Sequence, residues 1–173
     1  MNKPRIILDM DDVIANLLTS WIEVVNFCEN ENVQLQDVSS WDIEKYFKCG
    51  RKVFDYLNYD LYRNLKPIEG SQDGVRMLQE KYDVYIVTVS TTHKDSLIAK
   101  IEWLEEYFPF IKKEKIVLLG DKSIVRGDII IDDSIKNLER FDGRKILFNS
   151  CHNQGNVQFE RVNGWSEILD RLL

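Results

Sequence analysis

Cysteine, proline and glycine are all scarce in this chain of 173 residues, which contains 3 Cys, 3 Pro and 8 Gly. The cysteines (Cys28, Cys49 and Cys151) are odd in number and far apart, so they predict neither a disulfide framework nor a zinc site. The low Pro and Gly content excludes a collagen-like repeat and argues against extended disorder. We therefore expect a folded chain with reduced thiols, which is typical of a cytoplasmic protein.

Long apolar runs and an excess of positive charge are also lacking. The N-terminal segment has only the short run Ile6–Leu8 before its first acidic residue, which is too short for a signal peptide or a membrane span. With 23 basic against 29 acidic side chains, the net charge is 23 − 29 = −6. An acidic chain is a poor partner for duplex nucleic acid, although a locally positive site can still bind a small anion. No membrane and no duplex nucleic-acid partner is expected, and a homodimer is left open.

Five short apolar runs without polar alternation are typical of strands that are buried on both faces of a parallel sheet. They span Arg5–Leu8, Asp83–Val87, Lys115–Leu119, Asp128–Ile131 and Lys145–Asn149. Helical periodicity predicts helices over Ser71–Tyr82, Asp95–Phe108, Ser134–Arg140 and Gly164–Leu173. The second of these would bury one face made of Leu97, Ile98, Ile101, Leu104 and Phe108. The alternation of strands and helices predicts an α/β fold with a central parallel sheet.

Residues 14–66 form an unusually long connection between the first two expected strands. They contain helical patterns over Ile14–Asn30 and Ile43–Leu57 and many aromatic side chains. One interpretation is a helical hairpin that packs on the sheet, and the other is a cap above the end of strand one. Because long insertions tend to be lids or binding loops, we predict a core of residues 1–13 and 67–173 and a helical cap of residues 14–66.

Acidic residues follow two of the expected strands directly. Asp9, Asp11 and Asp12 come after the first strand, and Asp132 with Asp133 comes after a later one. Ligands bind at the carboxyl ends of parallel strands in α/β proteins, and carboxylates that meet there repel unless a cation relieves them. Each cluster alone could simply cap a helix. Together they predict a site for a hard divalent cation such as Mg²⁺.

Two further strand exits carry groups that can hold a phosphate beside such a cation. Thr88 supplies a hydroxyl and Lys122 an ammonium. Either residue alone would more often be an ordinary strand threonine or a surface lysine. Their combination with the acidic strand ends favours phosphate chemistry.

With these residues in order, the chain resembles the haloacid dehalogenase (HAD) superfamily of phosphatases, whose Rossmann-like core has three layers. The order Asp9-x-Asp11, Thr88, Lys122 and Asp132-Asp133 spans the chain. It differs from response-regulator receivers, in which the phosphorylated aspartate lies on an internal strand. Within the superfamily the resemblance is to the 5'(3')-deoxyribonucleotidases, through Asp9–Ala15, Tyr85–Thr88, Lys100–Phe108, Asp121–Val125, Ile131–Asp133, Leu147–Gln154 and Trp165.

The resemblance is imperfect at three places. Asp12 stands where that family usually has Gly, Val89-Ser90 replaces Ser-Pro, and Ser134 replaces an Arg. These departures lie beside the expected phosphate and substrate contacts. They leave the nucleotide and the preference for deoxyribose open.

The resemblance implies a role for each candidate residue. Asp9 would be the nucleophile that forms an aspartyl-phosphate, and Asp11 the general acid and then base. Mg²⁺ would be bound by Asp9, the Asp11 carbonyl and Asp133. Asp132 would support these ligands from behind rather than bind the metal directly. The expected substrate contacts are Thr88 and Lys122 on the phosphoryl group, Lys94 as a further phosphate contact, and Trp41, from the cap, on a base.

Two other functions stay open at this level. The chain could be a HAD phosphatase for another small phosphomonoester, such as a sugar phosphate, since cap specificity cannot be derived from one sequence. It could also be a non-catalytic nucleotide-binding module, although the complete set of acids, Thr88 and Lys122 argues against that. A dehalogenase is disfavoured because that reaction needs no acid at the position of Asp11. Adjacent Cys151 and His152 do not predict a nucleophile pair, since adjacency does not create the geometry.

Overall fold

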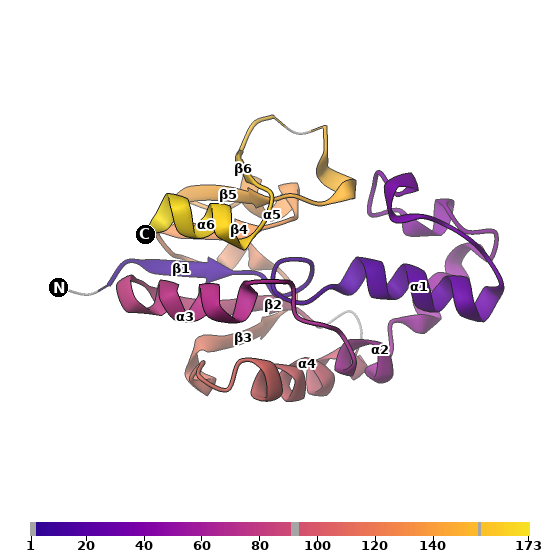
Figure 1. Ribbon diagram of the computed structural model, residues 1–173, viewed down its shortest axis with the longest axis horizontal. Coiled ribbons are helices and arrows are strands. Elements are labelled where there is room, and N and C mark those ends of the chain that lie inside the picture. Colours follow the sequence, from indigo (N-terminus) through magenta and orange to yellow (C-terminus); the bar gives the residue numbers. More distant parts are fainter. Residues whose placement is uncertain (1–2, 91–93, 156) are drawn as a thin grey trace.

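The computed structural model of the chain describes residues 3–90, 94–155 and 157–173. Within this part, six parallel strands form one sheet in the order β3-β2-β1-β4-β5-β6 (Figure 1). The strands are β1 Arg5–Leu8, β2 Asp83–Val89, β3 Ile116–Leu119, β4 Ile129–Asp132, β5 Arg144–Phe148 and β6 Glu160–Val162. The α/β class with a parallel sheet is confirmed, and β6 is a strand that the sequence analysis did not predict.

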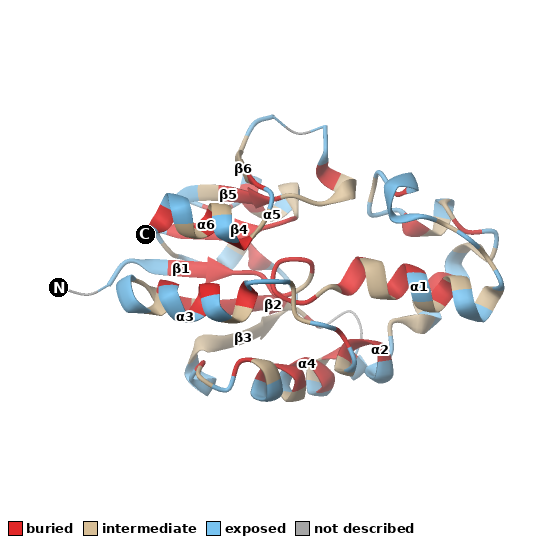
Figure 2. Cartoon of the chain, viewed as in Figure 1, coloured by how far each residue is buried: buried red, intermediate tan, exposed pale blue. Residues whose placement is uncertain are grey.

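Helices cover both faces of this sheet, which makes three layers. The α-helices are α1 Leu17–Glu29, α2 Tyr59–Arg63, α3 Ser71–Lys81, α4 Lys94–Tyr107, α5 Ile135–Glu139 and α6 Trp165–Leu172. Of these, α3, α4 and α6 contribute to one core cluster and α5 to the other, whereas α1 and α2 belong to the connection between β1 and α3. Because strand side chains alternate, Ile6 joins the core cluster that contains α3 and α6, whereas Ile7 joins a second cluster with Leu138 of α5. In Figure 2 the central strands are largely buried, and the outer surfaces of α3 and α4 are exposed.

Trp165 joins α6 to the loop that follows β1. Its indole Nε1 donates a hydrogen bond of 2.9 Å to the carbonyl of Val13. The ring also lies directly on Gly74 of α3, where an added Cβ would come within 2.2 Å of ring carbon Cε3. A side chain at position 74 would therefore displace the indole and with it the support of the loop.

The buried face of α4 differs from the expected one. Ile98 is 61% exposed and Ile101 is 38% exposed, whereas Ala99, Lys100 and Trp103 are buried. The prediction was wrong for Ile98 and Ile101, whereas Leu104 and Phe108 are buried as expected, because the expected face was drawn from apolar residues alone. In this helix a lysine lies on the buried face.

The connection between β1 and α3 projects beyond the carboxyl ends of the strands, where α1 and the turns after it extend away from the sheet (Figure 1). The helix expected over Ile43–Leu57 is wrong: short 3-10 turns occupy Ile43–Lys45 and Gly50–Tyr56, because Gly50 has a positive φ of 57° that interrupts an α-helix. The division into a core and a cap of residues 14–66 stays a prediction. None of the helices in the described part of the chain is long and apolar enough to cross a membrane.

Candidate active site

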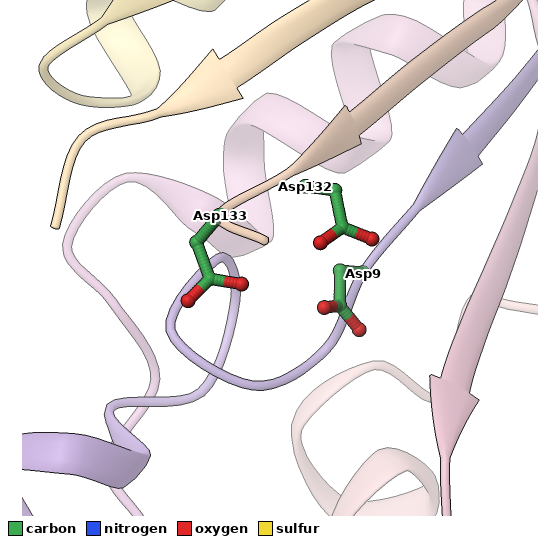
Figure 3. A group of neighbouring side chains, drawn as sticks. All are labelled: Asp9, Asp132 and Asp133. Carbon is green, nitrogen blue, oxygen red and sulfur yellow. The ribbon is translucent and has the colours of Figure 1, made fainter. Parts of the chain in front are cut away.

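Three acidic side chains converge where β1 and β4 end. The two strands are neighbours in register, and the amide of Asp9 extends their pairing with a 3.0 Å hydrogen bond to the carbonyl of Ile131. Carboxylate oxygens of Asp9, Asp132 and Asp133 consequently lie within 4.8 Å of one another (Figure 3). Because β1 has β2 on one side and β4 on the other, the cluster lies where ligands bind in open α/β sheets.

Lys122 lies between two of these carboxylates. Its Nζ is 2.6 Å from Asp9 Oδ1 and 2.7 Å from Asp132 Oδ2, and the side chain is buried. One ammonium does not neutralise three buried carboxylates. Burial, and then the charge of Asp132, raise the pKa of Asp9 to about 6, and burial raises the pKa of Asp133 well above its usual value. A second positive charge would relieve this excess, and oxygen donors suit a hard divalent cation, so these residues fit a metal ion.

The two adjacent acids of β4 have different surroundings. Asp132 already accepts hydrogen bonds from Lys122, from the amide of Ser134 at 2.9 Å and from Asn137 Nδ2 at 3.1 Å. Asp133 lines the cavity, and its Oδ2 lies 2.8 Å from His152 Nε2. Asp133 is therefore the better placed of the two to offer an oxygen to a ligand.

A second polar cluster joins β1, β2 and α4. Asp11 Oδ2 lies 2.5 Å from Lys100 Nζ, which also donates to Thr88 Oγ1 and to the carbonyl of Val89, each at 2.9 Å. Burial raises the pKa of Asp11 above its ordinary value, although the ammonium of Lys100 opposes this shift. The two residues expected to bind phosphate and to transfer a proton thus share one lysine, which sequence reasoning missed.

A cavity of about 330 Å³ opens above these clusters. Asp9, Asp11, Asp133 and Lys122 line its polar side. The opposite wall comes from the segment between β1 and α3 and is made of Leu17, Trp21, Trp41, Phe54, Leu57 and Tyr62. The structure therefore brings most of the predicted site residues together, with Thr88 and Asp132 buried beside the cavity rather than lining it.

Two residues differ from the sequence expectations: Lys94 was expected in the site and lies outside the cavity wall, whereas His152 was not expected there and contacts Asp133. Lys94 is the exposed first residue of α4 and, within the described residues, is not part of the cavity wall. His152 had no expected role, yet its ring packs on Trp41 with 4.4 Å between ring centroids while it also contacts Asp133. No local signal in the sequence could have paired His152 with an acid 19 residues away.

Comparison with known proteins agrees with this geometry. A family model described as "5' nucleotidase, deoxy (Pyrimidine), cytosolic type C protein" matches residues 3–173. The 5'(3')-deoxyribonucleotidase of Bacillus subtilis is 48% identical over 171 residues, covering 99% of each chain. That of Clostridium acetobutylicum is 36% identical over 170 residues, covering 96% of this chain and 93% of that protein. The chain belongs to the 5'(3')-deoxyribonucleotidase family.

Solved structures extend the likeness of this deoxyribonucleotidase-family chain to the wider fold. YfnB of Bacillus subtilis, a HAD-type protein with bound magnesium, superposes with a TM-score of 0.63 at 15% identity, covering 99% of each chain. SP0104 of Streptococcus pneumoniae, a haloacid dehalogenase-like hydrolase, gives a TM-score of 0.57 at 12% identity, also covering 99% of each chain. At such low identity these matches show the HAD fold alone.

Asp12, at the position where the family resemblance predicts a glycine, has a defined structural setting. Asp12 has a φ of 55°, a left-handed conformation that glycine adopts freely and that aspartate tolerates better than most residues. Its Oδ1 accepts a 2.9 Å hydrogen bond from the amide of Leu18 in the first turn of α1. The aspartate thus supplies an acceptor to α1 that a glycine would lack.

Proposed function

We propose that this chain is a Mg²⁺-dependent phosphatase of deoxynucleoside or nucleoside monophosphates that works through an aspartyl-phosphate. The observation that carries the proposal is the convergence of Asp9, Asp11, Lys122 and the Asp132–Asp133 pair at one sheet edge, below an aromatic wall. Relatives that cover nearly the whole chain and bear the name 5'(3')-deoxyribonucleotidase support the same substrate class.

The proposed first step is an in-line attack by Asp9 on phosphorus. The described contacts to the Asp9 carboxylate, from Lys122 and from the amide of Met10, both fall on Oδ1, which leaves Oδ2 for the attack. As the new P–O bond forms, the bond to the nucleoside oxygen breaks. Asp11 gives its proton to that leaving oxygen.

The proposed second step releases phosphate. Asp11, now ionised, takes a proton from a water molecule, and the resulting nucleophile attacks phosphorus and frees Asp9. Lys122 and the hydroxyl of Thr88 would hold the transferring phosphoryl oxygens through both steps. Each group lies at the carboxyl end of its strand or in the loop after it, so all of them stand at the same edge of the sheet.

Asp9, Asp133 and the backbone carbonyl of Asp11 are the proposed metal ligands, and Asp132 holds Lys122 behind them. Mg²⁺, when bound, would neutralise charge on the phosphate and on the carboxylate cluster. The hydrogen bonds that already saturate Asp132 support Asp133 as the direct ligand.

The aromatic wall supports a substrate with a planar base. Trp41, which is 40% exposed, borders the cavity together with Phe54 and Tyr62 and offers a face for stacking. The proposed location is the cytoplasm, where the free thiols of this chain stay reduced.

A substrate panel tests the proposed function. Purified protein is assayed for phosphate release from deoxynucleoside 5'- and 3'-monophosphates, ribonucleotides and sugar phosphates, with Mg²⁺ or with EDTA. Mg²⁺-dependent release from nucleotides is expected. A preference for sugar phosphates would show that the substrates are sugar phosphates and not nucleotides. Release of phosphate from none of the substrates would favour a non-catalytic nucleotide-binding module.

Asp9→Asn is expected to abolish turnover, because an amide is a poor nucleophile toward phosphorus, with a loss of at least about 10⁴-fold in kcat. The assay is steady-state phosphate release with Mg²⁺ present. Asp142→Asn, the same change at an exposed acid outside the site, is the matched control and should keep full activity. Substantial residual turnover by Asp9→Asn would rule out Asp9 as the nucleophile.

A further inference from the structure

Lys100 is a lysine in the interior of the protein, on the buried face of α4. Its side chain is 1% exposed, and its neighbours on the same face are Ala99, Trp103 and Leu104. The ring of Tyr62, from α2, covers the ammonium at 5.1 Å from its centroid. Removing an ammonium from water is costly unless its donors are fully satisfied, so the hydrogen bonds of Lys100 account for its burial.

The ammonium has three N–H donors, and the structure provides three acceptors. These are Asp11 Oδ2 at 2.5 Å, Thr88 Oγ1 at 2.9 Å and the carbonyl of Val89 at 2.9 Å. An ammonium has no acceptor, so the hydroxyl of Thr88 must be the acceptor in its bond with Lys100. The proton of that hydroxyl is therefore free to point to another acceptor, as a phosphoryl oxygen would be.

The same lysine makes the two oxygens of Asp11 unequal. Oδ2 is held by Lys100, whereas Oδ1 is buried and has no hydrogen-bond partner among the described residues. Asp11 itself lines the cavity. When Asp11 is protonated, its proton is therefore on Oδ1. A proton on Oδ2 would point at the N–H donors of Lys100 and be repelled by them.

Stability alone does not explain this arrangement. A buried ion pair is commonly no more stabilising than well-packed apolar side chains of similar volume. Here the surrounding face of α4 is apolar, so a methionine at position 100 would fit the packing. What an apolar residue could not do is hold Asp11 and Thr88 in fixed relative positions.

We infer that Lys100 is a positioning residue that fixes the orientation of the general acid Asp11. This inference rests on the proposed phosphatase function. It assigns the lysine no proton transfer of its own. Its effect on the first step is confined to substrates whose leaving oxygen Asp11 must protonate.

The test compares two leaving groups in the full-length protein with Mg²⁺. A nucleoside leaving oxygen needs protonation, whereas 4-nitrophenolate departs without much help. Lys100→Met is expected to lower kcat/KM, which reports only the steps up to departure of the leaving group, about 100-fold for a deoxynucleoside 5'-monophosphate and less than about fivefold for 4-nitrophenyl phosphate, because general-acid catalysis contributes at least about 10²-fold. KM for the nucleotide should change little. Lys112→Met, at an exposed lysine, is the matched control.

Combining Lys100→Met with Asp11→Asn distinguishes a positioning role of Lys100 from a general structural role. If Lys100 acts through Asp11, adding Lys100→Met to Asp11→Asn should cause no further loss with the nucleotide. Equal losses on both substrates, or full additivity in the double variant, would overturn the inference while leaving the phosphatase function standing. If the wild-type protein hydrolyses neither substrate, the proposed function falls and this inference with it.

Lys100→Arg keeps the test decisive if the methionine variant does not fold. The planar guanidinium retains the charge but cannot match three acceptors arranged around one nitrogen. We expect a loss for the nucleotide that is smaller than the loss in Lys100→Met and again larger than the loss for 4-nitrophenyl phosphate. An arginine variant that lowers both activities by the same factor would contradict the assignment.

Discussion

At the scale of single residues, Asp12 is the clearest case of a side chain whose burial and backbone conformation lower the stability of the folded state. It is buried beside the acidic cluster, its backbone is left-handed, and its Oδ2 finds no hydrogen-bond partner among the described residues. Burial and the nearby charge of Asp133 raise the pKa of Asp12 well above its usual value. One favourable contact opposes this effect: Asp12 Oδ1 accepts a hydrogen bond from the amide of Leu18.

Asp12→Asn should stabilise the metal-free protein, because asparagine keeps that acceptor, tolerates the left-handed backbone and carries no charge. A raised folded-state pKa means that the unfolded chain binds fewer protons, so the wild type loses stability as pH rises above the unfolded value. Asparagine does not ionise, so the variant does not lose stability in this way as pH rises. We expect its Tm in EDTA to exceed that of wild type by about 3 °C at about pH 8, and by less at about pH 5.

Thermal unfolding of both proteins at the two pH values measures this difference. Asp55→Asn, an exposed acid in the turn Gly50–Tyr56, is the control and should leave Tm unchanged at both. A gap between Asp12→Asn and wild type that does not depend on pH would show that charge is not its cause.

At the scale of elements, the loop that carries Trp41 meets the core above the acidic cluster. Trp41 lies between the 3-10 turns Leu35–Asp37 and Ile43–Lys45 and packs on His152, which in turn contacts Asp133. Asn153 fixes the same core loop by donating to the carbonyls of Asp133 and Phe148 at 2.9 Å. A ligand that stacks on Trp41 is thereby placed within reach of Asp133.

Trp41→Ala is expected to raise KM for a deoxynucleoside monophosphate about tenfold, the equivalent of about 1.4 kcal/mol of stacking. KM for a phosphomonoester without a base, such as glycerol phosphate, should change little. Trp41→Phe retains a ring for stacking and is the matched control. An equal rise in KM for both substrates would show that the tryptophan shapes the site without contacting a base.

At the scale of the whole molecule, the net charge of −6 includes a cluster of acids that a cation would relieve. The proposed Mg²⁺ site exists only in the folded state, so Mg²⁺ at about 100 times its Kd should stabilise the protein by roughly 2.7 kcal/mol. Protons compete for the same oxygens, and the pKa of Asp9 is raised to about 6, so the increase in Tm should shrink below about pH 6.

The measurement is Tm with and without Mg²⁺ across this pH range. Asp133→Asn should lose most of the increase, whereas Asp142→Asn, outside the site, should keep it. Stabilisation of Asp133→Asn equal to that of wild type would place the metal elsewhere.

The sequence predicted the sheet well, because five of its strands are short apolar runs, of which the central β1 and β4 are buried along nearly their whole length. It did not predict β6, where Glu160-Arg161-Val162 offers one apolar residue in three. The turn at Gly50 was missed because glycine shows its positive φ only in the structure.

Apart from Trp41, which the family resemblance suggested, the candidate-site residues that the sequence predicted and the structure brings together lie at the ends of strands or directly after them. Asp9, Asp11, Thr88 and Lys122 lie at strand ends, and topology alone brings these together. Lys100 lies in the middle of a helix, and its partner Asp11 is 89 residues away. Periodicity places such a lysine in solvent, so only its contacts reveal what it does.

The hydrogen bond from Trp165 to Val13 also has a consequence for the order in which the protein is made. Asp9, the proposed nucleophile, is synthesised well before Trp165, yet the loop that follows Asp9 receives this support at Val13 from a residue 152 positions further along the chain. The α6 helix that carries Trp165 must be synthesised and must dock before the loop is complete. A nascent chain can therefore complete this loop only after α6 has been synthesised and has docked.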